Sequence, residues 1–322
     1  MKTAFLRGLL ACALAALCGA SAQAQDYPSR PIRVVVPFPP GGGADVLMRP
    51  FGKKLSDILG QPIVLDNRGG ANGNIGADHV AKSAPDGYTL LIGNSSLPIS
   101  ATLYEKLSFD PLKDLTMIGL VSNTPSALVV HPGVPARNMA ELIALAKAQP
   151  GKLNFGSAGT GSTPQLSIEQ LKTMAGVDMV HVPYKGSGPA VAAVLAGDVQ
   201  VLVSNVGTVL AQIKAGKLRA LGVTSAQRVA VLPEVPPIGE TVKGYDSRTW
   251  YAMMGPANLP PAIVARLNSA IAEALRAPDV RKQLLDTGYE PESNTPQAMA
   301  TLFREDIAVW SKVIKASGTK AE

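Results

Sequence analysis

Two glycine-rich loops contain the residues of this sequence that are best suited to chemistry. Residues 37–45 read Pro-Phe-Pro-Pro-Gly-Gly-Gly-Ala-Asp, and residues 157–163 read Ser-Ala-Gly-Thr-Gly-Ser-Thr. Each loop follows a short apolar run and precedes a helical stretch. The first N–H groups of a helix have no intrahelical acceptor, and the helix dipole places partial positive charge beside them. Both loops are therefore predicted to hold an anion with main-chain amides.

Polar residues at the ends of other predicted strands could complete this anion site. Asn94, Ser95, Tyr184 and Asn205 each end or follow an apolar run, and ligands of open α/β sheets gather at the carboxyl ends of strands. The complete set of predicted ligand-binding residues is Phe38, Gly41, Gly42, Gly43, Asp45, Asn94, Ser95, Gly159, Thr160, Gly161, Ser162, Thr163, Tyr184 and Asn205.

Structural roles compete with binding at several of these positions. Asp45 lies in the first turn of a predicted helix, where a carboxylate can satisfy loop or helix amides. Ser162 and Thr163 could cap the helix that follows them. Tyr184 could pack in the wall of a cleft. The sequence leaves these alternatives open.

Patterns typical of enzymes, metal sites and cofactor sites do not emerge. His79, His131 and His181 are scattered and stand at no metal-ligand spacing from cysteines or carboxylates. Residues 159–164, Gly-Thr-Gly-Ser-Thr-Pro, lack the last glycine of the dinucleotide fingerprint. Ser157 has no plausible general base, so a nucleophilic role has little support. We expect no catalysis, no metal and no cofactor.

The N-terminus has the pattern of a secretory signal peptide. Lys2 and Arg7 precede the apolar run 9–17, and Ala-Gln-Ala at 22–24 matches a cleavage site. We expect cleavage after residue 24, which would remove both cysteines, Cys12 and Cys18. A lipid anchor on Cys18 is the disfavoured alternative, since the bulky Leu17 precedes it.

The charge balance excludes other classes of partner. Thirty Lys and Arg residues against 24 Asp and Glu give a formal net charge of +6. The basic residues form no block and no stripe interleaved with aromatic residues, so nucleic-acid binding is not expected. No apolar run after the signal peptide is long enough to span a membrane. We expect an exported, soluble monomer.

The apolar pattern predicts two α/β domains joined by a hinge of two crossing strands. Strands near 32–36, 62–65 and 88–93 alternate with helices near 44–59 and 71–83, which indicates a mostly parallel sheet with helices on both faces. Runs 117–121 and 127–130 are joined by residues 122–125 with no helix between them, so we expect the chain to cross there into a second domain.

The predicted boundaries follow from that crossing and from a second one near residue 225. Domain 1 comprises residues 25–122 and 225–322, and domain 2 comprises residues 123–224. The two glycine loops would then face each other across a cleft and hold one anion from both sides. Pro50, inside the first helix, should kink that helix near Val46 or shorten it.

Five sequence blocks resemble the Bug-type extracytoplasmic solute receptors, the substrate-binding subunits of tripartite tricarboxylate transporters. They are residues 36–45, 66–73, 85–90, 156–162 and 182–186, and the resemblance covers essentially the whole mature chain. It implies a two-lobed periplasmic-binding-protein fold that closes on a small carboxylate. In the family, the loop matching residues 38–45 holds the ligand partly through ordered water, and the loop matching residues 159–163 takes a carboxylate directly.

The resemblance implies a periplasmic receptor that delivers a carboxylate to a membrane permease. A receptor that signals to a sensor kinase would share every motif, and an enzyme acting on a carboxylate is the remaining alternative.

If the amide of Gly161 binds the carboxylate, Gly161→Pro should weaken binding strongly, because proline has no N–H.

Overall fold

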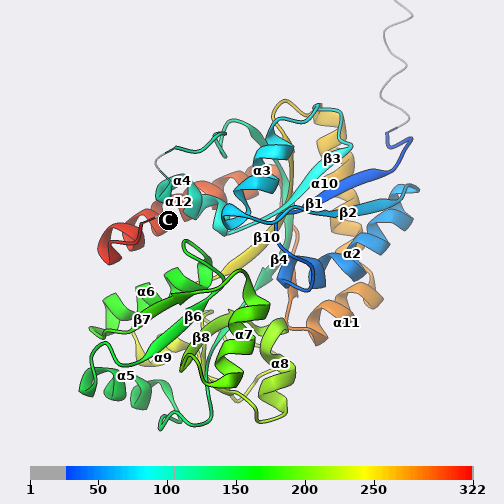
Figure 1. Cartoon of the computed structure of the whole chain (residues 1–322). Coiled ribbons are helices and arrows are strands. Elements are labelled where there is room, and N and C mark those ends of the chain that lie inside the picture. The colour runs from blue at the N-terminus through cyan, green and yellow to red at the C-terminus, as the bar shows by residue number, and fades with distance from the viewer. Residues whose placement is uncertain (1–26, 105, 321–322) are drawn as a thin grey trace, which may run out of the picture.

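The computed structural model describes residues 27–104 and 106–320. The predicted signal peptide, residues 1–24, lies outside them, as do Cys12 and Cys18. In the described part of the chain, two mixed sheets, each flanked by helices, form two lobes (Figure 1). The α/β class, the two sheets and the two lobes expected from the sequence are confirmed.

The first lobe contains a six-stranded sheet with the strand order β11-β4-β10-β3-β1-β2. β1 pairs in parallel with β2 and β3, whereas β10 runs antiparallel to β3 and β4. The strands are β1 (Ile32–Val36), β2 (Ile63–Asn67), β3 (Thr89–Asn94), β4 (Leu115–Thr124), β10 (Thr249–Pro256) and β11 (Glu290–Pro291). The helices are α2 (Gly43–Leu59), η1 (Ala71–Gly73), α3 (Asn74–Ala81), α4 (Ser96–Leu103), α10 (Pro261–Arg276), α11 (Pro278–Asp286) and α12 (Pro296–Ser317).

The second lobe contains a five-stranded sheet with the strand order β7-β6-β8-β5-β9. β6 pairs in parallel with β7 and β8, and β5 runs antiparallel to β8 and β9. The strands are β5 (Ser126–Val130), β6 (Asn154–Ser157), β7 (Val180–Pro183), β8 (Val201–Asn205) and β9 (Arg219–Val223). The helices are α5 (Met139–Ala148), α6 (Thr163–Ala175), α7 (Ser187–Ala196), α8 (Val206–Lys214) and α9 (Ile238–Thr241).

The packing of α2 on β1 fixes where the first glycine loop points. Phe51 and Leu55 of α2 are four residues apart, so they lie on one helix face, and they are buried with Val34 and Val36 of β1 in one apolar core. Burying each such side chain contributes roughly 1.5–3 kcal/mol. The N-terminus of α2 is thereby held beyond the carboxyl end of β1.

Pro50 neither ends nor shortens this helix. α2 runs continuously from Gly43 to Leu59 with Pro50 inside it, so the expectation of a shortened helix was wrong. The missing N–H leaves the carbonyl of Val46 without its usual intrahelical donor. The buried apolar face of α2 provides enough packing to outweigh this local loss.

The chain crosses between the lobes at two neighbouring points. β4 and β5 are separated only by Pro125, so the joint is shorter than the expected 122–125, and β4 extends to Thr124. After β9, the N–H of Thr224 donates to the carbonyl of Ser126 (2.8 Å), and the carbonyl of Thr224 accepts from the N–H of Ser247 (2.9 Å). These bonds join the return segment to the first crossing.

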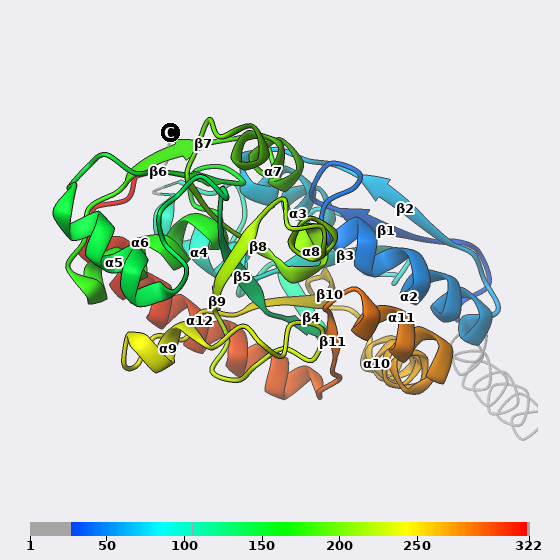
Figure 2. The ribbon, with the colours of Figure 1, turned by 90° about the horizontal axis from the view of Figure 1, so that it is seen from below.

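Helix α12 contacts both lobes. It packs on α4 of the first lobe and on α6 of the second, and Figures 1 and 2 show it lying beside both. Five buried apolar residues form a cluster where the three helices meet: Ile99, Leu103, Leu166, Trp310 and Ile314. We call this set the α12 cluster.

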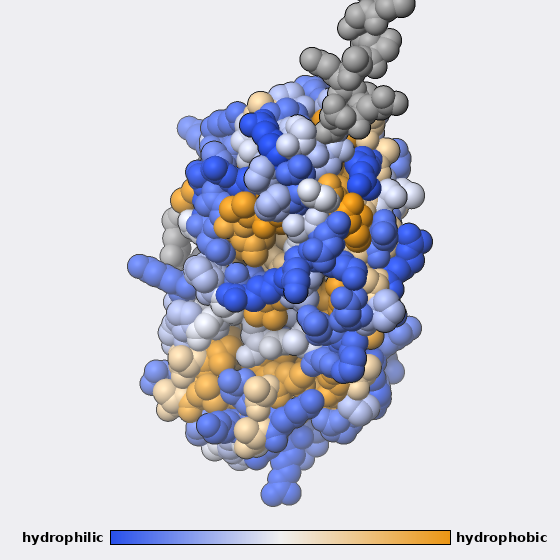
Figure 3. All heavy atoms as spheres, turned by 90° about the vertical axis from the view of Figure 1, so that its right-hand side faces the viewer, coloured by the Kyte–Doolittle hydropathy of each residue, from blue (hydrophilic) through white to orange (hydrophobic). Residues whose placement is uncertain are grey.

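The surface mixes polar and apolar residues. On the side drawn in Figure 3, hydrophilic residues cover most of the area and apolar residues form smaller areas between them. Among the described residues, the helices are all too short or too polar to cross a membrane. The same residues contain no group of three or more His, Cys, Asp or Glu side chains placed to hold a metal ion.

Candidate functional site

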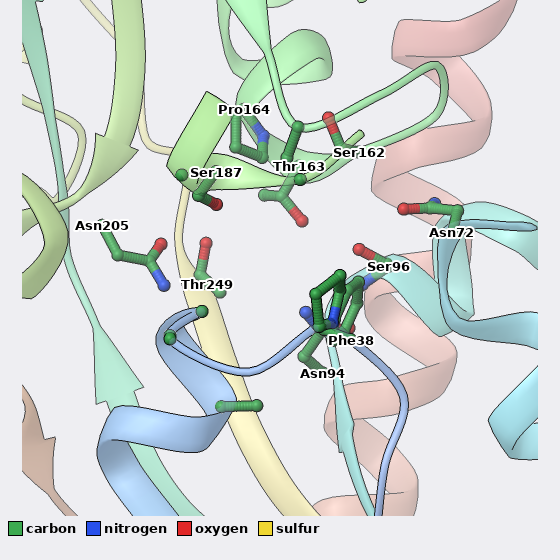
Figure 4. A pocket seen from close by; sticks show the side chains of 18 of the residues that line it. Phe38, Asn72, Asn94, Ser96, Ser162, Thr163, Pro164, Ser187, Asn205 and Thr249 are labelled. Carbon is green, nitrogen blue, oxygen red and sulfur yellow. The ribbon is translucent and has the colours of Figure 1, made fainter. Parts of the chain in front are cut away.

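A cavity of about 250 Å³ lies between the two lobes. Both glycine loops contribute to its wall, and Figure 4 shows side chains of the two lobes on opposite sides of it. We call it the first cavity. It is lined by Phe38, Pro39, Pro40, Gly41, Gly42, Gly43, Ala44, Asn72, Asn94, Ser96, Ala158, Ser162, Thr163, Pro164, Lys185, Gly186, Ser187, Gly188, Pro189, Asn205, Thr249 and Tyr251.

The N-termini of four helices open onto this cavity. Its lining includes Gly43 at the start of α2, Ser96 at the start of α4, Thr163 at the start of α6 and Ser187 at the start of α7. Asn205, the residue before α8, lines it as well. Each helix start contributes about half a positive elementary charge and unpaired N–H groups. The partial charges and free N–H groups of these helix starts therefore favour a negatively charged ligand in the cavity.

Several amides at these helix starts lack an acceptor within the described part of the chain. The N–H groups of Gly43, Ala44, Thr163 and Ser187 have no hydrogen bond there. Two of those helices carry proline in their first turn, Pro164 in α6 and Pro189 in α7, which removes one donor from each. The remaining amides are available to a ligand that enters the cavity.

Unpaired hydroxyl groups add to this set of donors. Within the described residues, the side-chain oxygens of Ser96, Ser187 and Thr249 form no hydrogen bond, and the Oγ of Ser162 is buried without a partner. A serine or threonine hydroxyl can donate one hydrogen bond, and burying it unsatisfied is unfavourable by roughly 1–3 kcal/mol. A carboxylate, which only accepts, would satisfy these groups.

Tyr251 and Asn205 close one end of the cavity. The Nδ2 of Asn205 donates to the Tyr251 hydroxyl at 2.9 Å, and its Oδ1 accepts from the Oγ of Ser126 at 3.2 Å. Burial raises the pKa of Tyr251 well above its usual range, and the hydrogen bond from Asn205 offsets only part of that rise. The tyrosine therefore stays protonated and keeps its own proton for an acceptor in the cavity.

Hydrogen bonds across the lobes hold the cavity closed. The Oγ of Ser95 and the Oγ1 of Thr163 lie 2.9 Å apart in a buried contact. The Nδ2 of Asn72 donates to the carbonyl of Gly161 at 2.7 Å. With the Asn205–Tyr251 bond, these contacts join the first lobe to the second around the cavity. The structure is therefore of a closed arrangement of the lobes.

The structure brings most of the predicted site residues together around two adjoining cavities. The predicted residues in the lining of the first cavity are Phe38, Gly41, Gly42, Gly43, Asn94, Ser162, Thr163 and Asn205. A second cavity, of about 570 Å³, shares part of that wall and includes Gly159, Thr160 and Tyr184. Whether each residue touches a ligand stays a prediction.

Three predicted residues line neither cavity. Asp45 is 4% exposed, and its Oδ2 accepts from the N–H of Gly41 (3.0 Å) and from Arg49 (2.9 Å). It stabilises the glycine loop, as the structural alternative had it. Ser95 lies one layer behind the cavity, bonded to Thr163.

Gly161 is the third of these residues, and its amide is already engaged. Its N–H donates to the Oε1 of Gln165 at 2.7 Å, so it is not available to a ligand in this arrangement. Its φ of 78° is also incompatible with proline, whose φ is near −65°. Gly161→Pro would therefore distort the loop whether or not this amide contacts a ligand, so a loss of affinity in that variant would not identify the amide as a ligand donor.

Sequence reasoning missed a third loop and a strand. Lys185 and the helix start 186–189 line the first cavity, as do Asn72, Thr249 and Tyr251. The signal for the loop was present, because Gly-Ser-Gly-Pro at 186–189 follows a strand and opens a helix, as the two recognised loops do. The sequence contains no comparable signal for β10, because the residues around Thr249 do not show that this residue faces a cleft.

The ionised side chains among the described lining residues have one sign. Lys185 lines both, and no other Lys or Arg and no Asp, Glu or His is among the described residues of either lining. With helix N-termini and hydroxyl donors, this surrounding can bind and orient an anion. Among its described residues, the lining of the first cavity includes no pair of nucleophile and general base.

Comparisons with known proteins agree with this geometry. The family model described as "Tripartite tricarboxylate transporter family receptor" matches residues 47–319. BugT of Bordetella pertussis (strain Tohama I) is 40% identical over 308 residues, which cover 94% of this chain and 93% of BugT.

Solved structures extend the likeness to three dimensions. Rpa4515 of R. palustris, solved with adipate, is 37% identical with a TM-score of 0.88, covering 92% of this chain and 99% of that one. MatC of Rhodopseudomonas palustris, solved with bound malate, is 32% identical with a TM-score of 0.83, covering 89% of this chain and 100% of that one.

The periplasmic binding protein BugD superposes with a TM-score of 0.85 at 30% identity, covering 92% of this chain and 100% of that one. The fold is thus of the periplasmic-binding-protein type, as the sequence resemblance implied. The family model matches most of the chain, and solved relatives carry carboxylates. The chain belongs to the tripartite tricarboxylate transporter family of receptors, which are periplasmic solute-binding proteins.

Proposed function

We propose that this protein captures a small carboxylate between its lobes with main-chain amides and hydroxyl groups, and delivers it to the permease of a tripartite transporter. The observation that carries the proposal is the convergence of four helix N-termini on one cavity between the lobes whose described lining contains no Asp or Glu. A carboxylate can accept from several of these donors at once.

The binding free energy of such a site depends on closure. Four or five charge-assisted hydrogen bonds contribute about 6–15 kcal/mol, and the ordering cost of association is roughly 4–15 kcal/mol. Micromolar affinity requires about 8 kcal/mol net. The contacts formed between the lobes, including Ser95–Thr163 and Asn72–Gly161, therefore have to add to the direct contacts with the ligand.

The domain assignment describes how we expect closure to occur. Residues 25–122 with 225–322, and residues 123–224, move as two bodies about the crossings at Pro125 and Thr224. The cleavable signal peptide, residues 1–24, directs the chain to the periplasm. Release of the ligand to the permease then follows from opening at the membrane.

Relatives support the class of ligand. Rpa4515 was solved with adipate and MatC with malate, and both ligands are dicarboxylates. We therefore place this protein among the receptors for small organic acids and expect it to return its ligand unchanged.

A binding screen with a matched pair of variants tests the proposal. Dicarboxylates, tricarboxylates, acidic amino acids and aromatic acids are screened by thermal shift, and hits are measured by calorimetry. Thr163→Val keeps the shape of the side chain but removes the hydroxyl that lines the cavity and bonds to Ser95 across the lobes, so affinity should fall about tenfold to a hundredfold. Thr173→Val is the control, because Thr173 is exposed at the far end of the same helix.

Two results would contradict the proposal in different ways. If wild-type protein binds none of the acids in the screen, the carboxylate function is wrong. If the acids bind but Thr163→Val and Thr173→Val have the same affinity for them, the N-terminus of α6 is not the carboxylate site.

A further inference from the structure

The sequence contains one Asn-Gly pair, Asn72-Gly73. An asparagine side chain loses its amide when the backbone nitrogen of the next residue attacks it, and asparagine counts among the thermolabile residues. Glycine at the next position favours this attack, because it has no Cβ to obstruct it and because its backbone reaches dihedral angles that other residues avoid. Asn72 is therefore the asparagine of this chain whose neighbour hinders the reaction least.

Both reacting groups are held by hydrogen bonds in the closed arrangement of the lobes. The Nδ2 of Asn72 donates to the carbonyl of Gly161 in the other lobe at 2.7 Å, and the N–H of Gly73 donates to the carbonyl of Gly70 at 3.0 Å. The second bond lies within one loop, but the first must break when the lobes separate. Closure therefore restrains the side-chain amide of Asn72, and opening releases it.

The turn that contains the pair has a strained backbone. Ala71 and Asn72 have φ values of 46° and 54°, in the left-handed region that residues other than glycine seldom adopt. Such conformations persist only where surrounding contacts hold them, and the bond to Gly161 is one of those contacts. When the lobes open, residues 71–73 lose it and can reach the other backbone angles that attack on Asn72 requires.

The reaction needs water as its only co-reactant. The backbone nitrogen of Gly73 gives up its proton and bonds to Cγ of Asn72, the bond from Cγ to Nδ2 breaks, and ammonia leaves, so that a cyclic imide forms. Water then adds to one of the two imide carbonyls, and the ring C–N bond at that carbonyl breaks. The product is an aspartyl or an isoaspartyl residue with a carboxylate, and nothing is oxidised or reduced.

We infer that Asn72-Gly73 is a site of spontaneous deamidation, that the closed, ligand-bound receptor protects it, and that deamidation there weakens the capture of a carboxylate. The modification site follows from the pair and its surroundings alone. Its effect on capture rests on the proposed function.

The product opposes an anionic ligand for two reasons. Asn72 lines both cavities, and Figure 4 shows it on the side of Ser96 and Ser162. The described residues of the two linings include no Asp or Glu, so a carboxylate at this position adds a like charge that repels the ligand. A carboxylate also cannot donate to the carbonyl of Gly161, so the bond between the lobes is lost.

Peptide mapping by mass spectrometry tests the modification site. The wild-type protein is aged in mildly alkaline buffer without ligand and with saturating adipate or malate, whichever binds more tightly. Asn268 is the internal control, because the small residue Ser269 follows it. The Nδ2 of Asn268 donates to the carbonyls of Ile118 and Asn294 within the first lobe, so separation of the lobes does not release it.

We expect the ligand-free protein to lose the amide of Asn72 several times faster than that of Asn268, and we expect the ligand to slow the loss at Asn72 alone. If Asn72 keeps its amide, or converts no faster than Asn268, the pair is not a modification site. If saturating ligand leaves the rate at Asn72 unchanged, closure does not protect it.

Matched variants test the effect on capture by calorimetry with the same acid. Asn72→Asp carries the charge of the product, whereas Asn72→Ala loses only the bond between the lobes. Asn258→Asp is the control for net charge, because Asn258 is exposed and outside both linings. Asn72→Asp should bind about tenfold more weakly than Asn72→Ala, and Asn258→Asp should bind like the wild type. Thermal unfolding of each variant checks that the fold is intact.

Other outcomes separate this inference from the proposed function. Equal affinities of Asn72→Asp and Asn72→Ala would overturn the effect of the charge on capture, although the carboxylate function stands. If the wild-type protein binds no organic acid, the proposed function fails and the effect on capture fails with it. The rates at Asn72 and Asn268 in the ligand-free protein then still support or overturn the modification site.

Discussion

The hydroxyl groups of Ser95 and Thr163 are both predicted to bind a ligand, and the structure gives them different surroundings. Ser95 follows β3 at the cleft, which is why the sequence placed it in the site. The structure buries it completely and bonds it to Thr163, which does line the first cavity. In this arrangement we expect Ser95 to act on a ligand through Thr163, as a positioning residue, and its direct contact with a ligand stays a prediction.

Asp306 is a half-buried carboxyl group outside the site. It accepts a hydrogen bond from the Nε1 of Trp250 at 2.6 Å. Burial raises its pKa to about 6, and the bond from Trp250 offsets part of that rise. Because the folded state then binds the proton more tightly than the unfolded state, this group stabilises the fold fully below its ordinary pKa. That contribution is lost as the pH rises through about 6.

Asp306→Asn should therefore remove a pH-dependent loss of stability. The amide keeps an acceptor for Trp250 and stays neutral, so the variant and the wild type should be similarly stable near pH 4. Near pH 7.5 the variant should be more stable by about 1–3 kcal/mol. Urea unfolding at both pH values measures the difference, and a difference that is the same at both would contradict the assignment.

At the scale of the element, the sequence predicted what periodicity and glycine placement encode. It predicted β1, α2 and the loop between them within a residue or two, since apolar spacing and Gly41–Gly43 act locally. It missed the contribution of β10 to the site, because the antiparallel pairing of β10 with β3 and β4 brings Thr249 to the cleft from far along the chain.

Pro50 offers a direct test of how packing overrides a local preference. Pro50→Ala restores an N–H for the carbonyl of Val46 and removes a ring clash within α2. Because the helix already continues through this position, we expect the free energy of unfolding to rise by about 1–2 kcal/mol, after allowing for the freer unfolded chain. Urea denaturation followed by circular dichroism measures it.

Pro278→Ala is the matched control for that prediction. Pro278 is the first residue of α11, where proline suits the helix and its absent N–H would have had no intrahelical acceptor. Replacing it should lower stability slightly, because the unfolded chain gains freedom. If the two substitutions change the free energy of unfolding equally, the effect of proline on stability does not depend on its position in the helix.

At the scale of the whole molecule, the lobes also touch behind the wall of the first cavity, where Tyr289 bonds to the carbonyl of Gly43. The N-terminal turn of α8 lies against the turn 287–289, which follows α11 in the other lobe. A Cβ built on Gly207 would collide with the carbonyl oxygen of Thr287 and lie 2.9 Å from Cε2 of Tyr289. Glycine at this position therefore lets the lobes approach closely.

Gly207→Ala should hinder closure without harming either lobe. Alanine favours the helix by about 1 kcal/mol over glycine, so the stability of the ligand-free protein should not fall. The backbone carbonyl of Thr287 cannot swing aside as a side chain can, so ligand affinity should fall. Small-angle scattering should show that ligand compacts the variant less than the wild type.

Gly52→Ala is the control for this substitution. Gly52 lies inside α2, and a Cβ there would be 3.5 Å from Cε of Met48 and 3.7 Å from Cγ2 of Ile63, which is ordinary contact. It should leave closure and affinity unchanged. A Gly207→Ala variant that binds and compacts like Gly52→Ala would show that the α8 contact does not limit closure.

The position of α12 beside both lobes has a consequence for how affinity can vary. The α12 cluster joins Leu166 of the second lobe to Trp310, Ile314 and the residues of α4, and none of these residues lines the first cavity. Weakening the cluster lowers the population of closed molecules, and apparent affinity scales with that population for any guest. Substitutions there would change the working concentration range of the receptor while the ranking of its ligands stays the same.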